Sequence, residues 1–191
     1  MSCTVDDEIE RMFRVTDLMI TAHSILRDRF RRRALALDVC LLVGSAALAV
    51  IAVIEPSKIQ SIIGQDIPVS LLGALVGLFV VTASIVQLRV DWQGMSVLHG
   101  KAVEFLLAVK HELGRVKLEP QESERQRLFW PVRAKFELSG TVTPPIPEKR
   151  FLTLKREHRL KVECSKMLDS CPGTWPWLAR VKVFVRDNFR R

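Results

Sequence analysis

Two long apolar stretches dominate the hydrophobic pattern of the chain. Residues 34–54 run for 21 positions with a single charge, Asp38, and residues 67–86 run for 20 positions with none. A helix of this length reaches roughly 30 Å, the thickness of a bilayer core. The pattern predicts two transmembrane helices joined as a hairpin. A pair of buried core helices is the alternative, but this chain of 191 residues would have to surround both with amphipathic partners.

Amphipathic stretches flank the two spans. After the second span, residues suited to burial recur in steps of four and three, at Leu88, Trp92, Met95, His99, Ala102, Leu106, Val109, Leu113 and Val116. A weaker series precedes the first span, at Ile9, Met12, Thr16, Met19, His23, Leu26 and Phe30. Such spacing is typical of a helix face that packs on another helix. We call these two series the seam, and we expect both helices to continue the spans into the cytoplasm and to pack together.

Counting along the seam predicts one specific contact. The two helices leave the membrane side by side in opposite chain directions, so positions equally far from Ala34 and Leu88 lie level. His23 and His99 are each eleven positions away and should meet. Two facing histidines could form a polar layer that titrates near neutral pH and biases assembly. The alternative is that each is a partly buried seam residue with a backbone or water partner.

The rest of the chain predicts shorter helices. A helix is expected at about 123–138, interrupted or begun at Pro131, followed by a proline-rich stretch from Gly140 in which helix is unfavourable. A charged amphipathic helix is expected at 148–170. The tail 174–191 mixes tryptophan and phenylalanine with arginine and lysine, which suits the lipid headgroup layer; a terminal helix or strand packed on the cytoplasmic helices is the alternative.

These elements predict an all-α membrane protein. Its expected parts are an N-terminal cytoplasmic amphipathic helix (1–33), a transmembrane hairpin (34–87) and a cytoplasmic helical region (88–191) that opens with a long helix (88–116). The fold class is thus a two-span transmembrane hairpin continued into a cytoplasmic helical bundle.

Charge sets the expected orientation. Residues 1–33 hold seven lysines and arginines, whereas the turn Glu55–Asp66 holds only Lys58. Both termini are therefore expected in the cytoplasm. The net charge of +8 suits anionic lipid, and nucleic-acid binding is not expected because no zinc-finger spacing or aromatic RNA-binding signature accompanies it. The acidic start MSCTVDDEIE is unlike a cleavable signal, and the cysteines show no CxxC pair.

Small and polar residues within the spans are candidates for packing or for a pore. Gly44, Gly73 and Gly77 would let helix backbones approach closely, either within one hairpin or between copies. Asp38 lies about 6 Å inside the first span and could pair with Arg33 or Arg89. Alternatively, it faces a water-filled path between several hairpins, which Thr82, Ser84 and Gln87 could also line.

No catalytic arrangement competes with these features. The histidines lie on helical patterns without a nearby nucleophile, and His158 is expected on an exposed helix face. The chain contains no HExxH, phosphate-binding loop or paired-glycine fingerprint. We expect no enzyme activity, cofactor or metal.

The order of parts resembles the SLATT family, two-transmembrane effector domains of bacterial conflict systems. The resemblance lies in Trp92 and His99, seven apart after the second span, and in Phe151, Leu154, Lys155 and His158 after the proline-rich break. It implies an effector in the bacterial inner membrane that forms a pore or disrupts the membrane of a phage-infected cell. It also implies a homo-oligomer and a trigger from a separate sensor or nucleotide-signal-producing protein. The alternative is a non-conducting anchor that recruits a partner through its basic cytoplasmic helices.

Overall fold

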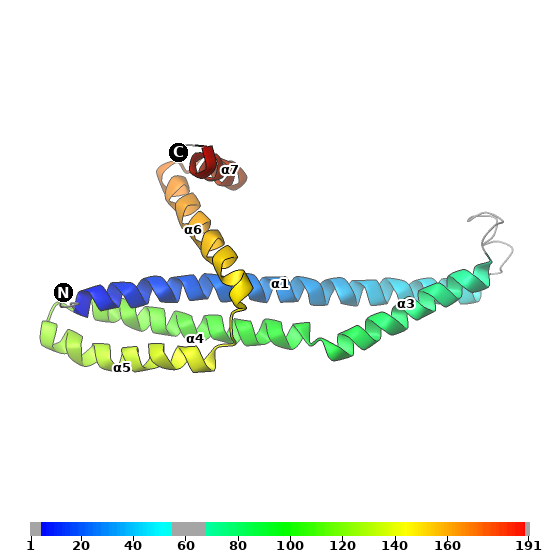
Figure 1. The fold of residues 1–191 in the computed structure, drawn as a ribbon, viewed down its shortest axis with the longest axis horizontal. Coiled ribbons are helices and arrows are strands. Elements are labelled where there is room, and N and C mark those ends of the chain that lie inside the picture. The colour runs from blue at the N-terminus through cyan, green and yellow to red at the C-terminus, as the bar shows by residue number, and fades with distance from the viewer. Residues whose placement is uncertain (1–4, 55–67, 190–191) are drawn as a thin grey trace. The chain divides into compact units, whose positions relative to one another are not determined.

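The described part of the chain is built from helices. The computed structural model describes residues 5–54 and 68–189, and all regular structure in these ranges is helical (Figure 1). The predicted all-α class is confirmed for these ranges, while the turn expected at Glu55–Asp66 lies outside the described residues. The helices are α1 (Val5–Val53), α3 (Val69–Arg89), α4 (Trp92–Leu118), α5 (Glu122–Val142), α6 (Glu148–Ser170) and α7 (Pro176–Phe189).

The chain divides into two compact units. One contains residues 27–97, and the other contains residues 1–26 together with 98–191. We call the first the hairpin unit and the second the bundle unit. Helix α1 belongs to both units, because the division between them falls after Leu26.

The hairpin unit contains two helices that are long and apolar enough to cross a membrane. In each, only 6% of the most apolar 18-residue window is buried. Large apolar side chains such as Leu42, Val43, Leu78 and Phe79 are exposed. A core helix of a soluble protein buries most of such a surface, and these two helices do not.

One expectation for the hairpin unit is wrong. The predicted long helix 88–116 does not continue the second span, because α3 ends at Arg89 and α4 begins at Trp92, with Val90 in extended backbone between them. Asp91 causes the new start, since its Oδ1 accepts a hydrogen bond of 2.7 Å from the Gly94 amide and so caps α4. Leu88, which was assigned to the seam, is left on α3 with 86% of its surface exposed.

The bundle unit is centred on the seam. Ile9 and Met12 of α1 form a buried core with Val109, Leu113 and Val116 of α4. Helix α5 covers this core with Phe129 and Val132, so three helices lie side by side (Figure 1). From His99 to Val116 every predicted α4 seam residue is buried.

Helix α5 is longer than the sequence predicts. It runs from Glu122 to Val142, through Pro131 and past Gly140, instead of ending near 138. Proline removes one backbone hydrogen bond and glycine weakens a helix. Burial of Phe129 and Val132, which flank Pro131, and of Ser139, which precedes Gly140, offsets both effects.

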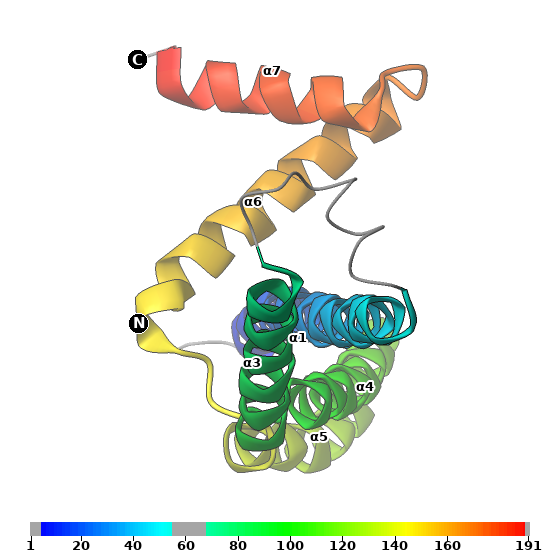
Figure 2. The same cartoon turned by 90° about the vertical axis from the view of Figure 1, so that its right-hand side faces the viewer.

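Helices α6 and α7 form the end of the bundle unit. Helix α6 spans Glu148–Ser170, the predicted range, with Leu154 and Cys164 buried. The tail is a helix, α7, which lies across the C-terminal part of α6 (Figure 2). Ala179 and Val183 of α7 are fully buried against a cluster that includes Cys164 and Leu168.

Candidate functional site

The predicted contact between His23 and His99 is present in the centre of the bundle. The two Nδ1 atoms lie 2.9 Å apart, and the ring centroids are separated by 5.1 Å. Both side chains are almost completely buried because the seam surrounds them with apolar residues of α1 and α4. The register counted from the two spans is therefore correct at this level of the bundle, despite the break at Val90.

The geometry of the pair requires at least one neutral ring. A hydrogen bond between two Nδ1 atoms needs one N–H donor and one lone pair, so two protonated rings would place two donors face to face. Burial, and secondarily the charge of His99, lowers the pKa of His23 to about 4. Burial also lowers the pKa of His99. The hypothesis of a layer that titrates near neutral pH is therefore wrong: near neutral pH, the pair is an uncharged buried contact.

Two polar atoms of the seam are buried without a hydrogen-bond partner. They are Nε2 of His23 and Oγ1 of Thr16, two turns away on the same helix, and neither has a partner within the described ranges. His23 Nε2 is an unsatisfied donor if Nδ1 accepts the bond from His99, and an unsatisfied acceptor if Nδ1 donates it. An unsatisfied buried polar group costs roughly 1–3 kcal/mol, so the seam is less stable at these positions than an all-apolar one.

A polar network next to the seam was missed by the sequence analysis. His158 of α6 is mostly buried, not exposed: its Nδ1 lies 3.0 Å from Thr21 Oγ1. The Thr21 hydroxyl donates to the backbone oxygen of Asp17, so it accepts from His158. The Asp17 carboxylate pairs with Lys110 at 2.5 Å. His158 shares a four-residue spacing with Leu154 and Val162, and this pattern could have indicated its burial.

Ion pairs fix how the bundle helices align. Glu10 of α1 pairs with Lys117 of α4, and Asp6 of α1 pairs with Arg125 in the first turn of α5. The hydrogen bond from Lys117 is the main cause of the lowered pKa of Glu10. Each exposed pair contributes little stability. Together with the Asp17–Lys110 pair, they favour one register of α1 against its neighbours.

Asp38 has a partner that the sequence analysis did not assign to it. Its Oδ1 accepts a hydrogen bond of 2.8 Å from Nε2 of Gln87, which joins α1 to α3 within the hairpin unit. The expected pairing with Arg33 or Arg89 is wrong, since neither arginine forms an ion pair with Asp38 in the described ranges. The Gln87 amide donates one hydrogen bond to Asp38 but, unlike an arginine, carries no positive charge.

The other polar candidates of the second span do not join Asp38. Thr82 donates to the backbone oxygen of Leu78, and Ser84 donates to that of Val80, both at 2.8 Å. Such bonds to the preceding turn satisfy a hydroxyl inside an apolar helix. The structure therefore brings together only Asp38 and Gln87 of the four predicted pore residues.

The three glycines of the spans differ in their surroundings. A Cβ on Gly44 would lie 2.7 Å from Cγ2 of Val80, so α1 and α3 approach closely there. A Cβ on Gly73 would meet Ile51 at an ordinary 3.6 Å, and one on Gly77 would have nothing within 4 Å. Gly44 is therefore needed for packing inside one hairpin, whereas Gly77 is not.

Trp92 is the first residue of α4 and directly follows the break between α3 and α4. It is half-buried and lines a small cavity of about 80 Å³ together with Asp38, Gln87 and Asp91. Trp92 is thus near the polar pair of the hairpin unit, not in the buried part of the seam. Within the described ranges, no cluster of histidine, cysteine and carboxylate residues is suited to hold a metal ion.

The bundle unit contains the buried pair of His23 and His99, and the hairpin unit contains the hydrogen bond from Gln87 to Asp38. Each of these two groups of polar contacts joins helices within its own unit. Comparison with known proteins adds nothing to this description: no family model, curated protein or solved structure matches the chain.

Proposed function

We propose that this chain is a two-span effector of the bacterial inner membrane that oligomerises on activation and permeabilises the membrane. The resemblance to the SLATT family supplies the biological setting, arrest or death of a phage-infected cell. In the resting state, the seam holds the cytoplasmic helices together. Activation by a partner protein or ligand repacks the seam, the spans cluster, and ions cross.

One observation carries the proposal: the apolar surface of both spans is almost entirely uncovered, although α1 and α3 already touch at Gly44. Lipid acyl chains cover this apolar surface in the resting state. Further copies of the hairpin can cover it on activation, and the exposed Asp38 and Gln87 would then lie at an interface between copies. A carboxylate in such a position attracts cations.

Dye measurements in living bacteria test the proposal. The chain is expressed from a tightly controlled promoter, with and without phage infection, while a voltage-sensitive dye reports the membrane potential. We expect the protein in the membrane fraction and a loss of potential before growth stops. Membrane residence without any loss of potential would contradict the proposal and favour the non-conducting anchor.

Two matched variants test the role of Asp38. Asp38→Asn removes the charge but keeps an oxygen for Gln87, and in reconstituted bilayers it should reduce the preference for cations over anions. Asp28→Asn makes the same change ten residues earlier on α1, where the carboxylate pairs with Arg27 at 2.9 Å, and should conduct like the parent chain. Equal selectivity of all three proteins would exclude Asp38 from the ion path.

A further inference from the structure

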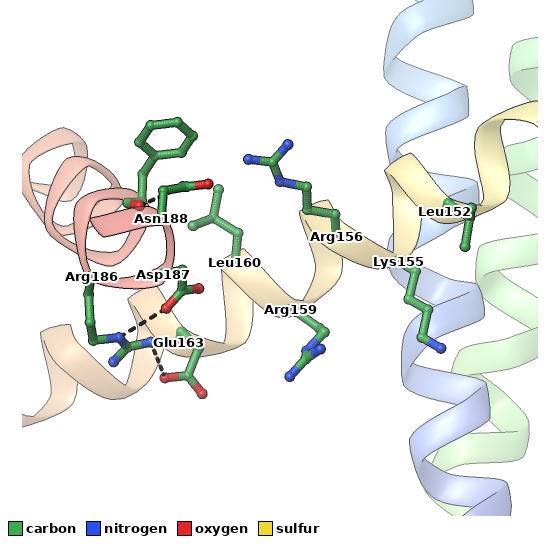
Figure 3. A pocket seen from close by; sticks show the side chains of 10 residues that line it. Leu152, Lys155, Arg156, Arg159, Leu160, Glu163, Arg186, Asp187 and Asn188 are labelled. Carbon is green, nitrogen blue, oxygen red and sulfur yellow. Dashed lines mark hydrogen bonds and ion pairs between the residues drawn. The ribbon is translucent and has the colours of Figure 1, made fainter. Parts of the chain in front are cut away.

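Helix α7 has one face packed and the opposite face bare. The packed face contains Ala179 and Val183, which are fully buried against α6. Arg186 adds a hydrogen bond of 3.1 Å to Glu163 of α6 (Figure 3). Since α7 is already held by this face, its other side is free to contact something else.

The bare face of α7 is apolar and aromatic. Trp177, Val181 and Val185 lie on this face at helical spacing, and Phe184 lies at its edge towards α6; each is about half exposed or more. Trp175, just before the helix, is also exposed. A stripe of this kind is unfavourable in water.

Cations border this apolar face. Arg180 and Lys182 of α7 are exposed on either side of the stripe. The guanidinium carbon of Arg156 on α6 lies 5.7 Å from the ring centre of Phe184, so it adjoins the same face. Arg156, Lys155 and Arg159 line an open cleft between the two helices, and none of them forms an ion pair within the described ranges (Figure 3).

The acidic groups of this cleft do not cancel that charge. Arg186 binds both carboxylates of the cleft, Glu163 and Asp187 (Figure 3). Its hydrogen bond is the main cause of the lowered pKa of Glu163, which keeps that group ionised and paired. Lys166 of α6 also pairs with Glu163. The other cations named above, Lys155, Arg156 and Arg159 of α6 and Arg180 and Lys182 of α7, are therefore available to an anionic partner.

We propose that α7 lies on the membrane surface, with its apolar face among the acyl chains nearest the headgroups and its cations on the phosphates of anionic lipid. Exposed tryptophan and phenylalanine bordered by arginine and lysine are typical of helices that bind this layer. A second copy of the chain is a poorer occupant, because it would bring the same cations against Arg180 and Lys182. The inference rests on the membrane residence of the proposed function, which places a bilayer within reach.

Tryptophan fluorescence of the full chain in vesicles tests this docking. The chain has four tryptophans, so variants with phenylalanine at the other three leave a single reporter at Trp177, Trp130 or Trp92. Each protein is reconstituted into phosphatidylcholine vesicles with or without phosphatidylglycerol, and the acyl chains carry bromine, which quenches nearby tryptophans. Trp130 on α5 is the matched control, because it is 62% exposed against 60% for Trp177 but lies outside the proposed surface.

We expect Trp177 to be quenched in vesicles with phosphatidylglycerol and much less in phosphatidylcholine alone, while Trp130 stays unquenched in both. Replacing Arg180 and Lys182 by glutamine should lower the ratio of docked to undocked α7 by roughly 25-fold, because each cation near an anionic surface contributes roughly fivefold.

Several outcomes would overturn the inference. Trp177 quenched no more than Trp130 would exclude docking, and equal quenching in both lipids would exclude recognition of anionic lipid. Shielding of Trp177 from acrylamide in concentrated detergent solution, without quenching by brominated lipid, would assign the face to a second copy. Trp92, next to the end of α3, reports on the spans: if it is unquenched, membrane residence itself fails, whereas quenching of Trp92 without Trp177 overturns only the docking of α7.

Discussion

The surroundings of His23 make the stability of the bundle depend on pH. A histidine has a pKa near 6.5 in the unfolded chain, and burial lowers that of His23 to about 4 in the fold. Between about pH 6.5 and about pH 4, the unfolded state therefore binds more protons than the folded state, and stability is lost as the pH falls through this window. Between about pH 7 and about pH 5, we expect the free energy of unfolding in detergent to fall by about 2 kcal/mol, measured by denaturant titration.

Two variants separate this effect from general acid denaturation. His23→Leu should flatten the pH dependence in that range, while His111→Leu, an exposed position on α4, should keep it. If the free energy of unfolding of His23→Leu falls with pH as steeply as that of the parent chain, the buried histidine pair does not cause the pH dependence.

The glycines of the spans give a second prediction at the residue scale. Gly44→Ala places a methyl group against Val80, whose β-branched side chain has little freedom in a helix, so we expect a loss of about 1–3 kcal/mol. Gly77→Ala meets no atom and should change stability little. Thermal unfolding in detergent measures both, and equal effects would contradict the close approach at Gly44.

At the scale of elements, the break between α3 and α4 depends on one carboxylate. Asp91→Ala should destabilise the start of α4 by about 1 kcal/mol, and Asp91→Asn, which keeps an acceptor oxygen, should have a smaller effect. Gly94→Ala should resemble Asp91→Ala, because its Cβ would lie 2.0 Å from Oδ2 of Asp91 and displace the cap. Thermal unfolding in detergent measures the changes, and no loss in Asp91→Ala would show that the cap does not determine the break.

The elements also show what the sequence can and cannot predict. Hydrophobic periodicity locates α6 and the buried part of the seam, including the contact of His23 with His99, because both depend on spacing alone. It fails at Val90, where a single side chain caps a new helix, and at Pro131, where tertiary burial outweighs a local breaker. The partner of Asp38 was also missed. Gln87 was named as a residue that could line the same path as Asp38, but whether Asp38 binds this amide or an arginine depends on side-chain geometry, which spacing does not give.

At the scale of the whole molecule, the five arginines between Arg27 and Arg33 predict the orientation. In a variant with Cys171 as its sole cysteine, we expect a membrane-impermeant maleimide to label the protein only after the cells are permeabilised. Replacing the five arginines by glutamine should expose part of the population to labelling in intact cells. Full labelling of the parent chain in intact cells would place the C-terminus outside.

The unpartnered Nε2 of His23 lowers the free-energy cost of separating α1 from α4 at this level of the seam. The desolvation penalty of this nitrogen is recovered when the rings separate and water reaches it, which offsets part of the free-energy cost of separation. Under the proposed function, a trigger would need less binding energy to open this contact than to open a wholly apolar one. The same unsatisfied nitrogen would also raise the rate at which α1 and α4 separate without a trigger.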